Sequence, residues 1–192
     1  MLTDMQRRKL PNLFAVHDLD RDGVLRRGDF EEYATRVASV RGWKPGSPQH
    51  EELTSRFMTF WDGFESFADA SGDLRITLEE WLIYWDQILS TPGLYDQIAR
   101  PIGDFIFNLF DRDGDGRVTA DEYAFIYQFG GLDPAQAAGA FARLDLDRDG
   151  FLSVSEIMTL LGQFFRSNDS KDPGNWLFGP FDEPSLVSAT TR

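Results

Sequence analysis

The chain has no cysteine among its 192 residues, and it has only two histidines. A disulfide framework, a thiolate zinc site and thiol chemistry are therefore excluded. No serine stands in a histidine-containing motif, and no glycine-rich stretch carries the Gly, Lys and Ser/Thr pattern that holds phosphates. The sequence gives no reason to expect catalysis, and we predict a protein that is not an enzyme.

The sequence also lacks long apolar runs and an excess of basic charge. No 18-residue apolar stretch is present, and the basic residues of segment 1–14 precede no apolar run, which argues against a secretory signal. Leu2 stands where N-myristoylation requires glycine. The net charge of −13 opposes binding to nucleic acid or to anionic membranes. We expect a cytoplasmic protein with neither of these partners.

Oxygen-bearing side chains recur instead at fixed intervals in two twelve-residue stretches, 111–122 (loop three) and 145–156 (loop four). Ca²⁺ takes six to eight oxygens, and such a loop supplies them from positions 1, 3, 5, 7, 9 and 12, with glycine at position 6. Thr119 and Ser153, at position 9, are expected to act through water. The other predicted ligands, with a backbone carbonyl at position 7, are Asp111, Asp113, Asp115, Arg117 and Glu122, then Asp145, Asp147, Asp149, Phe151 and Glu156.

A third stretch, 18–29 (loop one), follows the pattern with two defects. Arg26 at position 9 has no oxygen to offer, and position 12 holds an aspartate, whose short side chain reaches an ion less easily than glutamate. We predict a divalent-cation site in which Ca²⁺ is weakened relative to Mg²⁺. Its predicted ligands are Asp18, Asp20, Asp22, the carbonyl of Val24 and Asp29.

The fourth stretch, 69–80 (loop two), keeps nominal ligands but departs from the pattern at its turn. Leu74 occupies position 6, where a left-handed backbone costs a non-glycine residue about 1–2 kcal/mol, and Gly72 stands two residues early. Only three of its ligand positions are carboxylates. We predict a structural partner that holds little or no metal. Its nominal ligands are Asp69, Ser71, Asp73, the carbonyl of Arg75 and Glu80, with Thr77 at position 9.

Apolar residues at helical spacing flank every loop, which predicts a helix on each side of each loop. In the first of these helices Pro11 suits the first turn better than the interior. The apolar residues at position 8 of the loops should pair on short two-stranded ribbons, loop one with loop two and loop three with loop four. These residues are Leu25, Ile76, Val118 and Leu152.

The predicted fold is all-α, with four helix–loop–helix units in two pairs, 1–95 and 96–166, packed into one compact globule. A tail, 167–192, follows them. Within it the segment 176–181 forms an apolar patch of Trp176, Leu177, Phe178 and Phe181. We predict that this patch inserts into the core and fills the space a protein target would use. The alternative is that it only covers a surface.

These residues resemble the sarcoplasmic calcium-binding proteins and bacterial calerythrin, within the EF-hand superfamily, over nearly the whole chain. The resemblance rests on Asp29 followed by Phe30, on a degraded second loop before two intact ones, and on Phe164, Phe165 and the segment 175–181. It implies four EF-hands in one globule and a cytosolic Ca²⁺ buffer with metal in loops one, three and four, about three ions. Arg26 and the tail beyond Phe181 depart from the family pattern.

Two other functions remain open on the sequence. A Ca²⁺ sensor grips a target helix in a methionine-rich groove, but this chain has four Met against 17 Phe and five Trp. A related EF-hand branch holds a luciferin beside several buried histidines, whereas only His17 and His50 are present here. We favour a monomeric buffer, with Mg²⁺ exchange at loop one, and leave open a protein target or a small ligand.

Overall fold

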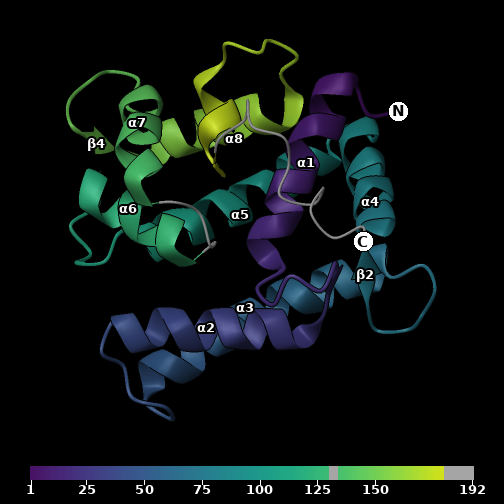
Figure 1. The fold of residues 1–192 in the computed structure, drawn as a ribbon, viewed down its shortest axis with the longest axis horizontal. Coiled ribbons are helices and arrows are strands. Elements are labelled where there is room, and N and C mark those ends of the chain that lie inside the picture. The colour runs from purple at the N-terminus through teal and green to yellow at the C-terminus, as the bar shows by residue number, and fades with distance from the viewer. Residues whose placement is uncertain (130–133, 180–192) are drawn as a thin grey trace.

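The computed structural model describes residues 1–129 and 134–179 (Figure 1). Phe181 of the predicted patch lies outside these residues. Helices make up most of the described chain, as predicted, and within it no helix has both the length and the apolar character needed to cross a bilayer. The helices are α1 Asp4–His17, α2 Arg27–Val40, α3 Pro48–Ala68, α4 Leu78–Ser90, α5 Leu94–Phe110, α6 Ala120–Phe129, α7 Pro134–Leu144 and α8 Val154–Arg166.

Two short antiparallel ribbons join the loops in pairs. Strand β1 (Val24–Leu25) pairs with β2 (Ile76–Thr77), and β3 (Val118–Thr119) pairs with β4 (Phe151–Leu152). Leu25 lies opposite Ile76 and Val118 opposite Leu152, and all four are fully buried. The predicted pairing of the loops is thus confirmed.

Two helices contain a proline in their interior. Thr3 and Gln6 form a capping box, with bonds of 2.8 and 3.3 Å, so α1 starts at Asp4 and Pro11 lies in its interior. Our placement of Pro11 in a first turn was wrong. Helix α5 starts after Gly93 and likewise holds a proline, Pro101, in its interior. Because an interior proline removes only one helical hydrogen bond, buried neighbours such as Leu10 and Tyr95 can outweigh it.

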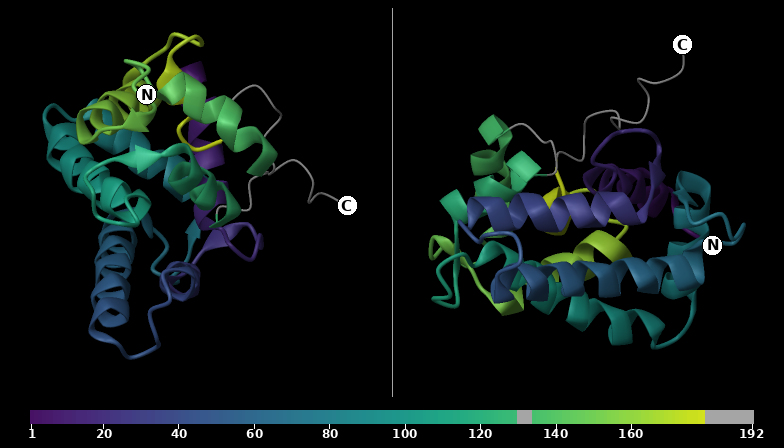
Figure 2. Two further views of the ribbon diagram at one scale, coloured as in Figure 1. Left: turned by 90° about the vertical axis from the view of Figure 1, so that its left-hand side faces the viewer. Right: turned by 90° about the horizontal axis from the view of Figure 1, so that it is seen from below.

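Aromatic side chains from both halves of the chain meet in one core. Trp85 of α4 stacks on Phe165 of α8 with ring centroids 4.3 Å apart, and Phe57 of α3 meets Phe105 of α5 at 5.0 Å. Figure 2 shows α2 and α3 side by side along one edge of the molecule, with α5 and α8 beyond them. The apolar faces of the two EF-hand pairs therefore cover each other.

The tail returns to this core after α8. A short 3-10 helix, η1 (Pro173–Trp176), packs on α8 and α7. Leu177 is 3% exposed, and the ring of Phe178 lies 4.8 Å from that of Phe164. The hydroxyl of Tyr123 lies 3.3 Å from the carbonyl oxygens of Trp176 and Leu177 and donates to them. The described part of the apolar patch thus packs into the C-terminal half.

Candidate metal centres

Loops three and four each bring three carboxylates together. Oxygen atoms of Asp111, Asp113 and Glu122 lie within 4.8 Å of one another, and so do those of Asp145, Asp147 and Glu156. At position 6 Gly116 and Gly150 adopt φ of 83° and 90°, the left-handed backbone that favours glycine. The predicted ligands at positions 1, 3 and 12 therefore converge, whereas Asp115 and Asp149 at position 5 stand outside these close groups.

Backbone N–H groups hold the first carboxylate of each loop. Asp111 accepts hydrogen bonds from Gly114, Asp115 and Gly116 at 2.8–3.1 Å. Asp145 accepts equivalent bonds from Asp149 and Gly150 at 3.2 and 2.9 Å. The loops are therefore folded around their carboxylates, which lowers the ordering cost of binding an ion.

The glutamate at position 12 is fixed by the loop that it closes. Glu122 accepts from the backbone N–H groups of Arg112 and Thr119, both at 2.8 Å, and from the Thr119 hydroxyl at 2.9 Å. Burial raises the pKa of Glu122, but these hydrogen bonds outweigh it and hold the pKa below its usual value. Glu156 is held in the same way by Leu146 and Ser153, with the same net lowering of its pKa. Both are ionised at neutral pH and ready for a cation.

Position 9 has a structural role in addition to any ligand role. The hydroxyl of Ser153 caps α8 by accepting from the N–H of Glu156 at 3.2 Å, and Thr119 does the same for Glu122. Thr77 caps α4 in loop two at 3.3 Å. Arg26, at this position in loop one, makes no side-chain cap. The water-mediated contact expected of Thr119 and Ser153 stays a prediction.

Loop one gathers its carboxylates differently. The close group consists of Asp18, Asp20 and Asp22, without Asp29 at position 12, in line with the short reach of that side chain. Burial, with the negative charges of the neighbouring aspartates, raises the pKa values of Asp18 and Asp29. The guanidinium of Arg26 forms a hydrogen-bonded ion pair with Asp22. The sequence identified Arg26 as an inert position, whereas the structure shows that it competes for a ligand.

Loop two folds like the others despite Leu74. Leu74 has φ of 62°, so it adopts the strained conformation predicted for it. Gly72 has φ of 72° at position 4, where Arg21, Gly114 and Arg148 also have positive φ. Gly72 is therefore not displaced, and our interpretation of it as a defect was wrong, because positions 4 and 6 both turn left-handed.

The ligand geometry of loop two is nevertheless looser. Asp69 accepts from Gly72 and Leu74 at 2.7 and 2.9 Å, as in the other loops. Glu80, however, reaches the N–H of Ser71 at 3.3 Å, not that of position 2. Ser71, Asp73 and Arg75 are exposed. Within the described chain this loop forms no close group of three carboxylates.

The ribbons position the backbone carbonyls predicted at position 7. Val24 and Phe151 are the first residues of β1 and β4, and Arg75 and Arg117 directly precede β2 and β3. The guanidinium of Arg117 stacks over the Phe151 ring at 4.8 Å, across the ribbon. Because the pairing of the loops fixes these four residues, the side chain at position 7 is free to vary.

Arg41 supports loop three, a role that no motif in the sequence indicates. It caps the end of α2, and its guanidinium donates to the carbonyl oxygens of Asn108, Leu109 and Asp111 at 3.0, 2.9 and 3.3 Å. The first half of the chain thus holds the C-terminal end of α5, where loop three begins. An arginine after a helix is too common a feature to reveal a contact so distant in sequence.

The donor set of every loop consists of oxygens on a hinge between two helices, the set that a hard cation such as Ca²⁺ prefers. A family model for the EF hand matches residues 102–126 and 137–161, which contain loops three and four. The sarcoplasmic calcium-binding protein of Perinereis vancaurica tetradentata is 30% identical over 179 residues, covering 93% of this chain and 99% of the relative. Calerythrin of Saccharopolyspora erythraea is 27% identical over 166 residues, covering 85% and 94%.

The fold has a similar counterpart among solved structures. The coelenterazine-binding protein of Renilla muelleri, in its calcium-loaded apo form, superposes with a TM-score of 0.73 over 93% of this chain and 99% of that one, at 24% identity. The molecule is a calcium-binding EF-hand protein. Within that class the chain belongs to the family of sarcoplasmic calcium-binding proteins and calerythrin.

Proposed function

We propose that this protein is a cytoplasmic Ca²⁺ buffer that holds ions in loops one, three and four, with Mg²⁺ exchange at loop one. The observation that carries the proposal is that the apolar faces of the two EF-hand pairs cover each other. The stacking of Trp85 on Phe165 at 4.3 Å lies at this junction. A sensor must expose such a face to grip a target.

The tail supports the same function. Leu177 and Phe178 occupy the C-terminal half, where a target helix would otherwise lie against Phe164. Lys9 of α1 donates to the carbonyl oxygens of Gln163 and Ser167 and to Asn175 Oδ1 at 3.0–3.1 Å, and so ties the tail to both halves. Opening the molecule would break all of these contacts.

Binding itself is driven by electrostatics. Three Ca²⁺ ions would change the formal net charge from −13 to −7 and so relieve repulsion among the loop carboxylates. Glu122 and Glu156 would each bind the ion bidentately as the twelfth ligand. Such a molecule takes up Ca²⁺ without needing a large change of shape.

A luciferin-type ligand in the interior fits less well. The interior cavity lined by His17, Trp81 and Phe165 has a volume of about 90 Å³, enough for a few water molecules and not for a multi-ring compound. His17 lines this cavity and stacks on Phe30 with ring centroids 5.5 Å apart, and burial lowers its pKa to about 4. It is a neutral packing residue at physiological pH.

The test separates a buffer from a sensor. A buffer should keep the same radius of gyration in small-angle X-ray scattering after Ca²⁺ saturation of the folded protein, and it should not bind melittin, a basic amphipathic peptide, in Ca²⁺. Ca²⁺-dependent binding of melittin, with expansion of the protein, would identify a sensor and overturn the buffer proposal.

A further inference from the structure

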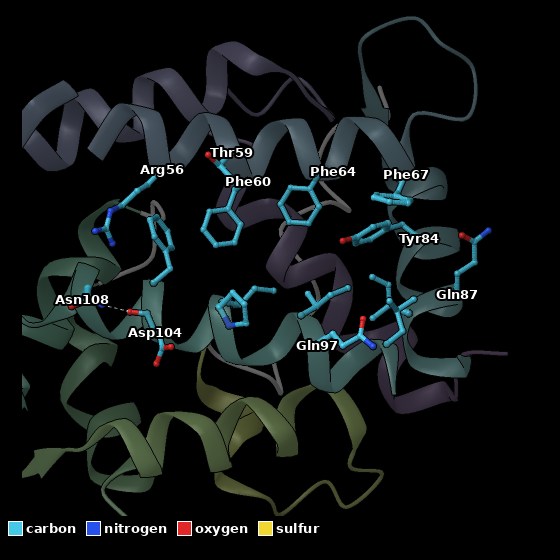
Figure 3. A pocket seen from close by; sticks show the side chains of 17 residues that line it. Arg56, Thr59, Phe60, Phe64, Phe67, Tyr84, Gln87, Gln97, Asp104 and Asn108 are labelled. Carbon is cyan, nitrogen blue, oxygen red and sulfur yellow. Dashed lines mark hydrogen bonds between the residues drawn. The ribbon is translucent and has the colours of Figure 1, made fainter. Parts of the chain in front are cut away.

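A groove of about 520 Å³ runs between α3, α4 and α5, away from the metal ligands (Figure 3). Phe60 and Phe64 of α3 line it, together with Ile98 and Ile102 of α5. Its volume lies within the range of small-molecule sites, which are mostly apolar with a few polar groups. It is several times larger than the interior cavity.

One polar group of the groove has no partner within the described part of the chain. Tyr84 of α4 is 7% exposed, lines the groove, and has no hydrogen-bond partner for its hydroxyl in the described part of the chain. Figure 3 shows this hydroxyl pointing into the groove beside Phe64. Burial raises the pKa of Tyr84 to about 12, so the hydroxyl keeps its proton at neutral pH. The hydroxyl is not among the fully buried polar atoms, so water reaches it in the groove, and a ligand oxygen that displaces this water can accept its hydrogen bond.

The charges around the groove specify a neutral occupant. Arg56 and Asp104 are the charged residues among those that line it. Each has its own partner on the same helix, Glu52 at 2.7 Å for Arg56 and Arg100 at 3.8 Å for Asp104. Among the described residues that line the groove, no unpaired cation is present that could bind an anionic ligand. The same residues form no acidic rim that could bind a basic helix.

Two further residues leave the groove open. Phe67, at the rim next to loop two, is 77% exposed, which is a large exposed apolar surface for one side chain. Gly63 lies on the wall, and a Cβ atom there would meet nothing within 4 Å. An apolar body could therefore lie against Phe67 and over Gly63 without displacing the protein.

We propose that this groove binds a neutral, largely apolar small molecule, whose rings or chain lie against Phe60, Phe64 and Phe67 while a carbonyl or hydroxyl oxygen accepts from Tyr84. The site is separate from the metal ligands, although its walls α3 and α4 are the helices that flank loop two. It does not depend on whether the protein is a buffer.

Nile red is a suitable probe, because it is neutral, apolar and carries one carbonyl, and its emission rises and shifts to the blue in apolar surroundings. We expect the Ca²⁺-loaded protein to bind it at one site. Gly63→Leu should fill the groove and weaken binding by about tenfold or more, and Tyr84→Phe by about three- to tenfold for the lost hydrogen bond. Gly139→Leu is the matched control, a helical glycine of α7 with equally open space and no part in the groove.

Binding of Nile red that Gly63→Leu leaves unchanged would place the dye elsewhere and overturn the proposal. No binding to the wild type would also overturn it. If sedimentation then showed a dimer that Gly63→Leu converts to a monomer, the groove would be covered by a second copy of the chain. If melittin bound and Gly63→Leu abolished its binding, the groove would belong to a protein partner.

Discussion

Single residues decide how strongly loop one binds its ion. Arg26 stands at position 9 and pairs with Asp22, a predicted ligand, so its positive charge opposes a cation at close range. In water, a unit charge about 6 Å from a divalent ion lowers the affinity for that ion by roughly tenfold, and less where salt screens it. Arg27, the next residue, carries the same charge but does not pair with a predicted ligand, so its substitution measures the effect of net charge alone.

Arg26→Ser should therefore raise the Ca²⁺ affinity of loop one by about tenfold, since it removes the charge and restores an oxygen at position 9. The measurement is a calorimetric titration of the metal-free variant. Arg27→Ser is the control, because Arg27 pairs with Glu31 on the outer face of α2 at 2.9 Å and should change the affinity by no more than about twofold. Equal effects of the two substitutions would contradict the role given to Arg26.

Leu74→Gly should stabilise the metal-free protein by about 1 kcal/mol. Leu74 is held at φ of 62° and is 63% exposed, so glycine relieves strain and removes little packing. Urea unfolding in a chelator measures the free energy of unfolding. Leu146→Gly, an exposed leucine without positive φ, should instead destabilise by about 0.5–1 kcal/mol. A loss of stability in Leu74→Gly would show that the loop carries no strain at this position.

The sequence predicted the metal sites best where acidic residues recur at a fixed spacing within one short loop. The spacing of Asp111, Asp113 and Glu122 placed these residues together because a short loop leaves few other arrangements. Arg41 and Lys9 could not be found this way, because each acts through partners far along the chain. Gly72 was interpreted as a displaced glycine because the loop pattern specifies glycine only at position 6. The backbone is left-handed at position 4 as well, which is where Gly72 lies.

At the scale of elements, the tail depends on one close approach between backbones. A Cβ atom on Gly174 of η1 would lie 2.3 Å from the carbonyl oxygen of Leu160 and 3.0 Å from the nitrogen of Phe164, both in α8. Gly174→Ala should therefore lower the free energy of unfolding by about 1–3 kcal/mol. Gly162→Ala, on α8 with nothing within 4 Å, is the control and should be neutral or stabilising. Thermal unfolding in Ca²⁺ distinguishes them, and equal stability of the two variants would mean that the tail does not pack on α8.

Lys9 should make stability depend on pH. Burial lowers its pKa to about 8 from a usual 10.5, while Asp172 raises it in part. The unfolded chain therefore binds more protons between pH 8 and 10.5, so this residue's contribution to stability grows as pH rises through that window and is lost as pH falls to 8. The difference in free energy of unfolding between the wild type and Lys9→Met should shift in favour of the wild type across it. A difference that is constant with pH would contradict the lowered pKa.

The helices themselves were predicted well, because apolar spacing and the loops fixed their order. The start of α1 was not, since Pro11 was given more weight than capping and packing. In α1 the Thr3–Gln6 capping box sets the start seven residues before Pro11. The preference of proline for the first turn is a local effect, and packing of one helix face against the core can outweigh it.

At the scale of the whole molecule, the all-α fold and the paired loops followed from the sequence, because each ribbon joins two loops through residues that are fully buried. The groove between α3, α4 and α5 did not follow from it. Its shape depends on how three helices meet, and the unpaired hydroxyl of Tyr84 has no signature in sequence spacing.

The most direct test of the account is a calorimetric Ca²⁺ titration of the metal-free protein, with and without millimolar Mg²⁺. The account predicts about three tight sites, one of them, loop one, strongly weakened by Mg²⁺. Glu122→Gln and Glu156→Gln should each remove one of the other two. Weak sites that fill cooperatively and ignore Mg²⁺, or a fourth tight site that is lost on changing Glu80 to Gln, would contradict it.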